Sequence, residues 1–155
     1  MNGTLSLADA LNRALGLYQA GHFDKAEAVC NAILRAKADH FDARHLLAIL
    51  QSRLERFQEA LANYDQALTI KPDHPDALNN RGNALLGLKR FDEALASYDK
   101  ALAIKPDHAN ALSNRGNALL EAFRRGVGEL RQGAGDRAQS SLRVFRISQL
   151  SAQTL

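Results

Sequence analysis

Three histidines recur at a fixed interval and are the first candidates for metal chemistry. His40, His74 and His108 are evenly spaced along the chain, and each follows an aspartate. Packed helices lie about 8–10 Å apart, whereas a metal–nitrogen bond is about 2.0–2.1 Å long. His22 and His45 have no cysteine or carboxylate at a metal-ligand spacing. We therefore predict no metal site and no cofactor, and we place the three spaced histidines in the connections between helices.

The single cysteine and the clustered carboxylates give no catalytic arrangement. Cys30 precedes Tyr64 by the same interval that separates Tyr64 from Tyr98, so we expect it to pack as a small apolar side chain inside a helix pair. A catalytic thiol needs a histidine and an electropositive setting, which the sequence does not offer. Asp92 and Glu93 lie at an expected helix start, where the helix dipole favours acids. The sequence therefore predicts a protein that is not an enzyme.

Asparagines form the most informative spaced set of polar side chains. The set consists of Asn12, Asn80, Asn83, Asn114 and Asn117. Its members recur three positions apart or at multiples of the histidine interval, and a spacing of three places two side chains on one helix face. A carboxamide both donates and accepts, so a row of them can pair with the backbone of an extended peptide. Leu46 and Ile49 interrupt the series. The alternative interpretation is a polar helix surface that was copied with a repeat.

An internal repeat of 34 residues, the interval between successive histidines of the set, positions all of these side chains. The copies are residues 7–40, 41–74, 75–108 and, in part, 109–121. Each complete copy reads as two helices. In the third copy, Pro75 suits a first helical turn, Lys89, Arg90 and Phe91 form the turn between the helices, and Pro106 follows the second helix because proline cannot continue one.

This pattern resembles the tetratricopeptide repeat family over residues 7 to 121. The residues that carry the resemblance in the third copy are Gly82, Leu85, Phe91, Ala94, Tyr98, Ala101 and Pro106. It implies an all-α solenoid of about 3.5 repeats, in which antiparallel helix pairs stack into a right-handed superhelix because a single pair cannot bury its apolar face. It also implies that the first helices line a concave groove. The five asparagines then face that groove, similar to the asparagine ladder of O-GlcNAc transferases.

Residues 122–155 depart from the repeat. They hold four glycines, six arginines and no lysine, and glycine at that density opposes a helix. We therefore expect a disordered or poorly folded basic tail outside the repeat array.

An out-of-frame translation accounts for the composition of this tail. We wrote the expected next helix, from Phe-Asp-Glu-Ala onward, in GC-rich codons and read it from the third base. The product is Arg124–Asp136, thirteen consecutive residues in order. We therefore interpret residues 122–155 as frameshifted sequence that truncates the array. The alternative is a genuine basic tail.

The charge distribution agrees with a boundary at residue 121. Residues 1–121 carry 14 Lys+Arg and 15 Asp+Glu, so the net charge of +3 comes from the tail. A basic patch would indicate nucleic acid, but the array is near neutral and we predict no nucleic-acid partner. No apolar run is long enough to span a membrane, and residues 1–7 show no secretory signal. We expect no membrane partner and a cytoplasmic location.

The sequence thus predicts a non-catalytic scaffold for protein–protein interaction. It would bind an extended peptide or a helix of a partner protein in the concave groove, where Arg44 and Arg81 are candidates for added cationic contacts. The alternative is the N-terminal substrate-binding array of a glycosyltransferase similar to O-GlcNAc transferase, truncated before its catalytic domain. Residues 80–85, Asn-Arg-Gly-Asn-Ala-Leu, are of the type found in such arrays.

Overall fold

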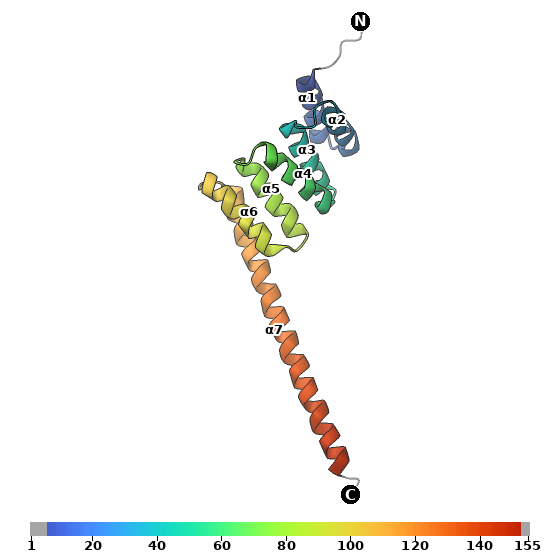
Figure 1. The fold of residues 1–155 in the computed structure, drawn as a ribbon, viewed down its shortest axis with the longest axis vertical. Helices are drawn as coiled ribbons and strands as arrows, with labels where there is room; N and C mark the ends of the chain where they lie inside the picture. Colours follow the sequence, from blue (N-terminus) through green and yellow to red (C-terminus); the bar gives the residue numbers. More distant parts are fainter. Residues whose placement is uncertain (1–5, 153–155) are drawn as a thin grey trace. The chain divides into compact units, whose positions relative to one another are not determined.

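The chain forms consecutive helix pairs in the computed structural model (Figure 1). The structure describes residues 6–152, and the side chains of residues 6–139. The helices are α1 (Leu7–Gln19), α2 (Phe23–Ala36), α3 (Phe41–Arg53), α4 (Phe57–Ile70), α5 (Pro75–Gly87), α6 (Phe91–Ile104) and α7 (Ala109–Ala152). Each helix from α1 to α5 packs on the next, and α3 also contacts α1 and α5. This confirms the all-α repeat array with one helix pair in each complete copy of the repeat.

Histidines cap the helices that begin the second, third and fourth copies. Nδ1 of His40, His74 and His108 accepts the backbone N–H three residues on, at 3.2 Å in each case. The bond satisfies a donor that a helix N-terminus leaves open. An accepting Nδ1 requires a neutral ring that carries its proton on Nε2, and Nε2 of His108 lies 2.9 Å from Asp76 Oδ1. The spaced histidines therefore start helices, a more specific role than the connecting position that the sequence predicted.

The turns inside the helix pairs share one backbone conformation. Gly21, Glu55 and Lys89 occupy equivalent positions and have φ values of 77°, 57° and 59°. In the third turn the amide of Arg90 bonds the carbonyl of Leu85 at 2.9 Å, and the other two turns close in the same way. This is the Schellman arrangement, in which a left-handed residue ends a helix. It reverses the chain after each first helix.

Small residues allow the paired helices to approach closely. Ala26, Ala60 and Ala94 take the same repeat position in the second helices, and all three are fully buried. Gly82 of α5 lies under the ring of Tyr98 in α6, where a Cβ atom would come within 2.5 Å of Tyr98 Cε1. The contact explains why this position holds a residue without a side chain.

The last helix extends further than the sequence predicted. Helix α7 includes most of the segment that we expected to be disordered or poorly folded. Each glycine costs roughly 1 kcal/mol in a helix, but the intervening Ala, Leu, Arg, Gln and Glu residues favour one. Ion pairs also join successive turns, Arg124 with Glu121 at 2.7 Å and Arg125 with Glu129 at 2.8 Å. Local helix propensity therefore outweighs the glycines, which corrects the predicted secondary structure.

The chain divides within α7 into two compact units, Met1–Ala118 and Leu119–Leu155. In the part of the second unit whose side chains the structure describes, residues 119–139, large apolar side chains are exposed to solvent: Leu120, Phe123 and Leu130 are 57%, 71% and 76% exposed. Over these residues the helix forms without the apolar burial that stabilises the repeats. Among residues 6–152, no helix is both long enough and apolar enough to cross a membrane.

Candidate functional site

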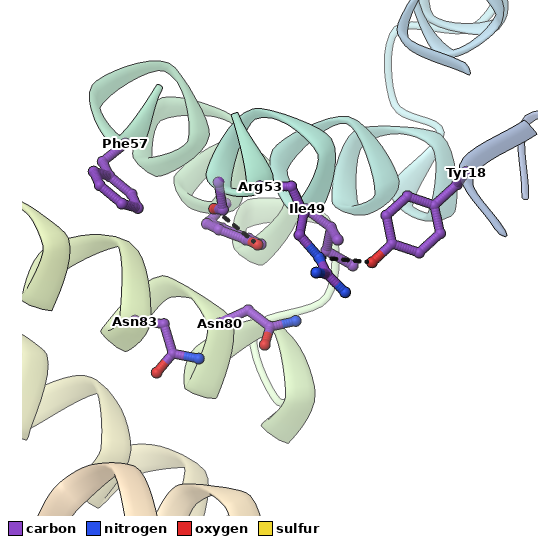
Figure 2. A pocket seen from close by; sticks show the side chains of 8 residues that line it. Tyr18, Ile49, Arg53, Phe57, Asn80 and Asn83 are labelled. Carbon is purple, nitrogen blue, oxygen red and sulfur yellow. Dashed lines mark hydrogen bonds between the residues drawn. The ribbon is translucent and has the colours of Figure 1, made fainter. Parts of the chain in front are cut away.

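Side chains of α1, α3, α4 and α5 line a pocket of about 430 Å³ in the first unit (Figure 2). We call it the first-helix pocket, because three of these four elements are the first helices of their pairs. Its residues are Tyr18, Ile49, Ser52, Arg53, Phe57, Tyr64, Asn80 and Asn83. Figure 2 shows Asn80 and Asn83 next to each other on α5, and Ile49, Arg53 and Phe57 on the neighbouring helices. The pocket therefore combines an apolar and aromatic wall with two carboxamides.

A row of carboxamides joins three successive first helices. Asn114 Nδ2 donates to Asn79 Oδ1 at 3.0 Å, and Asn79 Nδ2 donates to Asn80 Oδ1 at 3.2 Å. Asn80 Nδ2 lies 3.3 Å from Nε2 of His45. Burial, with a smaller effect of His74, lowers the pKa of His45 to about 4, so its ring is neutral at pH 7 and Nε2 can accept. The four side chains thus form one directed chain of hydrogen bonds from α7 to α3.

Asn83 has a free donor facing the pocket. Its Oδ1 accepts the hydroxyl of Tyr98 at 2.7 Å. Burial raises the pKa of Tyr98 well above its ordinary value, so the hydroxyl keeps its proton and donates. Among the described residues, Asn83 Nδ2 makes no hydrogen bond, and the side chain is exposed. This amide group can therefore donate to a bound ligand.

Arg44 and Arg81 do not line the first-helix pocket. Arg81 Nε forms an ion pair with Asp65 Oδ1 at 2.6 Å. Arg44 donates to the carbonyl of Ala38 at 2.6 Å and to Asn63 Oδ1 at 3.3 Å. Both guanidinium groups connect neighbouring helices of the array, so they do not supply the cationic contacts predicted for the groove.

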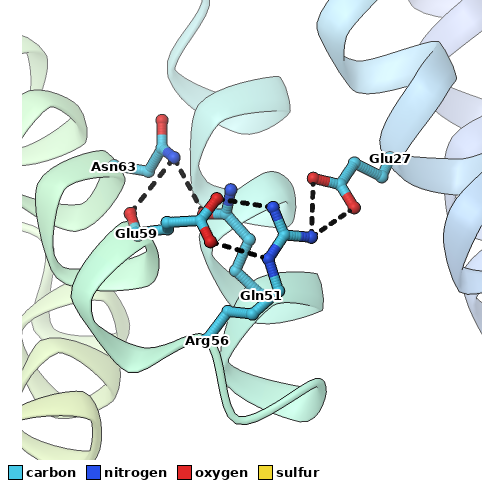
Figure 3. Close-up of polar contacts among 5 residues, drawn as sticks. All are labelled: Glu27, Gln51, Arg56, Glu59 and Asn63. Carbon is cyan, nitrogen blue, oxygen red and sulfur yellow. Dashed lines mark hydrogen bonds and ion pairs between the residues drawn. The ribbon is translucent and has the colours of Figure 1, made fainter.

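A polar cluster between the first and second helix pairs is satisfied internally (Figure 3). Arg56 forms ion pairs with Glu59 and, at 2.8 Å, with Glu27. Hydrogen bonds to Glu59 and Glu27 raise the pKa of Arg56, and the bond from Arg56 lowers the pKa of Glu59. Asn63 Nδ2 donates to Gln51 Oε1 at 2.8 Å. Each charge in the cluster has its partner, so we assign the cluster to the packing of the two pairs.

The five predicted asparagines occupy different surroundings. Asn80 and Asn83 line the first-helix pocket together. Asn114 is joined to Asn80 through one further carboxamide. Asn12 on α1 and Asn117 on α7 are exposed and lie outside the pocket lining. The structure therefore brings two members of the set to one pocket.

The pocket also contains residues that the sequence analysis did not select. Ile49, which interrupts the asparagine series, belongs to the pocket wall, whereas Leu46, the other interruption, is buried in the core. Tyr18 and Arg53 differ in residue type from their counterparts in the other copies. This divergence between copies is the sequence feature that could have identified Tyr18 and Arg53 as pocket residues. A repeat framework keeps its packing residues and varies its binding residues.

Cys30 and the histidines provide no alternative centre. Cys30 is fully buried, and burial raises the pKa of its thiol to about 12. The thiol is therefore protonated at neutral pH and packs in the core, as its repeat position predicted. In the part of the chain that the structure describes, no group of three or more His, Cys, Asp and Glu side chains is arranged to hold a metal ion.

The helix pairs, their constant period and the pocket on their first helices define a helical repeat protein. A comparison with protein families finds matches to the tetratricopeptide repeat over residues 11–75, 45–109 and 79–142. The chain belongs to the tetratricopeptide repeat family. The third match passes residue 121, the predicted end of the array. A search of curated proteins found no significant match.

Solved structures share the fold. A mutant of the Thermobaculum terrenum O-GlcNAc transferase is 25% identical with a TM-score of 0.70, and the match covers 73% of this chain and 22% of that one. A tetratricopeptide repeat protein from Parabacteroides merdae is 20% identical with a TM-score of 0.72, over 79% of this chain and 48% of that one. The second repeat domain of human RPAP3, in complex with an HSP70 peptide, is 18% identical with a TM-score of 0.68, over 70% and 91%.

Proposed function

We propose that this chain binds an extended segment of another protein along its first helices, without catalysing a reaction. The observation that carries the proposal is the first-helix pocket, which is lined both by apolar side chains and by Asn83 with its free amide donor. An extended segment exposes backbone carbonyls that accept such a donor, and its side chains alternate between pocket and solvent. A related domain of human RPAP3 is in complex with an HSP70 peptide, which supports a peptide as the ligand class.

Substitution of Asn83 by aspartate tests this function. Asn83→Asp keeps an oxygen for the Tyr98 hydroxyl but replaces the free amide donor by a second acceptor. We expect peptides selected on the wild-type chain, from a displayed library of random nine-residue peptides, to bind the variant at least about tenfold more weakly, because a peptide carbonyl would then face an oxygen. Fluorescence anisotropy with the synthetic peptides measures this change.

A matched control separates this effect from the added charge. Asn110→Asp makes the same substitution at an exposed position of α7 that does not line the pocket, and we expect its affinity to equal that of the wild type. Equal affinity of Asn83→Asp and wild type, or a library that yields no specific peptide, would contradict the proposed function.

A second candidate is the substrate-binding array of a larger O-GlcNAc-transferase-like enzyme. The 25% identity over 73% of this chain favours it, and the chain spans 22% of the length of that transferase structure. In this case the segment bound along the first helices would be a substrate presented to a catalytic domain. Both candidates use the same pocket and differ in what is encoded after the array.

The nucleotide sequence distinguishes the two candidates and tests the frameshift. We expect the DNA from codon 122 onward to encode, in another frame, the helix Phe-Asp-Glu-Ala-Leu-Ala-Ser-Tyr, which follows Lys89-Arg90 in the third copy. A nucleotide-sugar-binding domain in that frame would favour the enzyme array, and further repeats alone would favour the scaffold. An intact frame, without repeat-coding sequence in any other, would refute the frameshift and leave residues 122–155 as a genuine basic tail.

A further inference from the structure

The positive charge in the first-helix pocket has no carboxylate partner there. Arg53 Nε donates to the hydroxyl of Tyr18 at 3.3 Å, and the guanidinium carbon lies 5.9 Å from the centre of that ring. Among the described residues, Nη1 and Nη2 of Arg53 make no hydrogen bond and no ion pair. Of the described residues that line the pocket, none is acidic. Two parallel N–H donors held in this way match the two oxygens of a carboxylate.

Four other arginines of the array differ from Arg53 in this respect. Arg56, Arg81, Arg90 and Arg115 each form an ion pair with a carboxylate of the chain itself. The equivalents of Arg53 in the first and third copies are glutamine and glycine. The repeat framework therefore does not require a cation at this position, and the charge is specific to the pocket.

The apolar wall beside Arg53 is held in place by its neighbours. Ile49 lies one helical turn before Arg53 on α3. The ring of Phe57 packs over Gly87, where a Cβ atom would come within 2.8 Å of it. The hydroxyl of Tyr64 lies 3.4 Å from Ser52 Oγ. A pocket of about 430 Å³ with such walls falls in the range of sites that receive a bulky apolar group.

The spacing along α3 matches the spacing of an extended chain. Residues four apart in a helix are separated by about 6 Å along its axis, and alternate side chains of an extended strand are separated by about 6.5 Å. We propose that the pocket selects an extended segment in which a bulky apolar side chain lies two residues from an aspartate or glutamate. The apolar side chain packs on Ile49 and Phe57, and the side-chain carboxylate binds Nη1 and Nη2 of Arg53. This inference rests on the proposed function and specifies its ligand.

Two substitutions that copy residues from other repeats test the selection in the full chain. Arg53→Gln introduces the residue of the first copy, Gln19, and Ile49→Asn introduces that of the third, Asn83. Each substitution introduces a residue type that another copy of the repeat already has at the same position. Peptides of nine random residues are displayed with their C-termini fused to the coat protein, selected on the wild-type chain, and synthesised with amidated ends.

We expect the selected peptides to share an apolar residue and an acidic residue at a spacing of two. Arg53→Gln should weaken their binding at least tenfold and abolish the preference for glutamate over glutamine, while the apolar preference persists. Ile49→Asn should abolish the apolar preference. Lys100→Gln, which removes an exposed cation of α6 outside the pocket, should leave affinity unchanged.

Four results would overturn the selection rule. Selected peptides without the spacing, or equal affinity for Arg53→Gln and wild type, would refute it, while the proposed function stands if Asn83→Asp still weakens binding. If the preference for an acidic group appeared only with peptides that end in a free C-terminal carboxylate, Arg53 would bind that terminus. This result would refute binding of an aspartate or glutamate side chain. A library that yields no specific peptide would refute the selection rule and the proposed function together.

Discussion

Replacing His45 with asparagine is expected to reduce the loss of stability that the protein shows when the pH falls from 6.5 to about 4. His45 packs against Phe41, Tyr64 and His74, with ring centroids 5.5–5.9 Å apart. Its Nε2 lies 3.3 Å from the Asn80 amide, which favours the neutral ring. Burial first, then His74 and Lys71, lower its pKa from 6.5 to about 4, although Asp76 and Asp42 act in the opposite direction.

The sign of the effect follows from proton binding in the two states. Between pH 6.5 and about 4 the unfolded chain protonates His45 and the folded chain does not, so the contribution of His45 to stability falls as the pH falls through this window and is constant above it. The shift corresponds to a loss of up to about 3 kcal/mol. Asparagine does not titrate, and the third copy already has Asn79 at the same repeat position.

Urea unfolding at pH 7.5, 6.5, 5.5 and 4.5 measures this difference. We expect the free energy of unfolding to decrease less with falling pH in His45→Asn than in the wild type. His22→Asn is the matched control, because His22 is exposed and makes no side-chain capping bond, and its pH dependence should parallel that of the wild type. Parallel curves for His45→Asn and wild type would show that His45 does not contribute.

Adding a methyl group at Gly82 is expected to destabilise the protein, whereas the same change at Gly116 is expected to stabilise it. A Cβ atom on Gly82 would lie 2.5–2.8 Å from three ring atoms of Tyr98. The ring is fully buried and its hydroxyl is bonded to Asn83, so it cannot move without losing that bond. At Gly116, the equivalent position of the fourth copy, no atom lies within 4 Å of the added Cβ.

Helix propensity favours both substitutions equally, so the opposite signs come from overpacking at Gly82 alone. Alanine favours a helix over glycine by about 1 kcal/mol, and overpacking costs about 1–3 kcal/mol. We expect Gly82→Ala to lose about 1 kcal/mol and Gly116→Ala to gain somewhat less than about 1 kcal/mol. Chemical denaturation of both variants provides the measurement. A stabilised Gly82→Ala would mean that the Tyr98 ring can shift at little cost to accept an alanine, the residue type that the second copy has at this position, Ala48, in the cluster that contains Tyr64.

Much of the fold could be predicted from residues that recur in every copy. The alanines at positions 26, 60 and 94 and the tyrosines at positions 64 and 98 set the phase of the repeat, and all of them are buried as that phase requires. The helical structure of the tail could not be predicted in the same way. Its glycine content indicates a cost in helix stability, but the neighbouring residues have helix propensities that oppose this cost. There the helix of α7 continues past the predicted end of the array.

The candidate pocket was predictable only in part. Asn80 and Asn83 were identified by a spacing within one helix, and such spacing depends on local geometry alone. The use of Asn80 and Asn114 in a chain of hydrogen bonds through Asn79 to His45 depends on the register of α3, α5 and α7. A repeat alignment compares positions but does not give the rotation of one helix against the next.

The sequence by itself determined the repeat unit, the helix pairs and the family, because these follow from periodic packing residues within each copy of the repeat. Only the tertiary structure decided which polar groups remain free to bind. In the described part of the chain, Arg81 is paired with Asp65, whereas Arg53 lies beside Tyr18 and has no carboxylate partner. The physical reason is that a polar side chain satisfies itself on whichever neighbour the stacking of helices brings within about 3 Å, and stacking is set by contacts between copies.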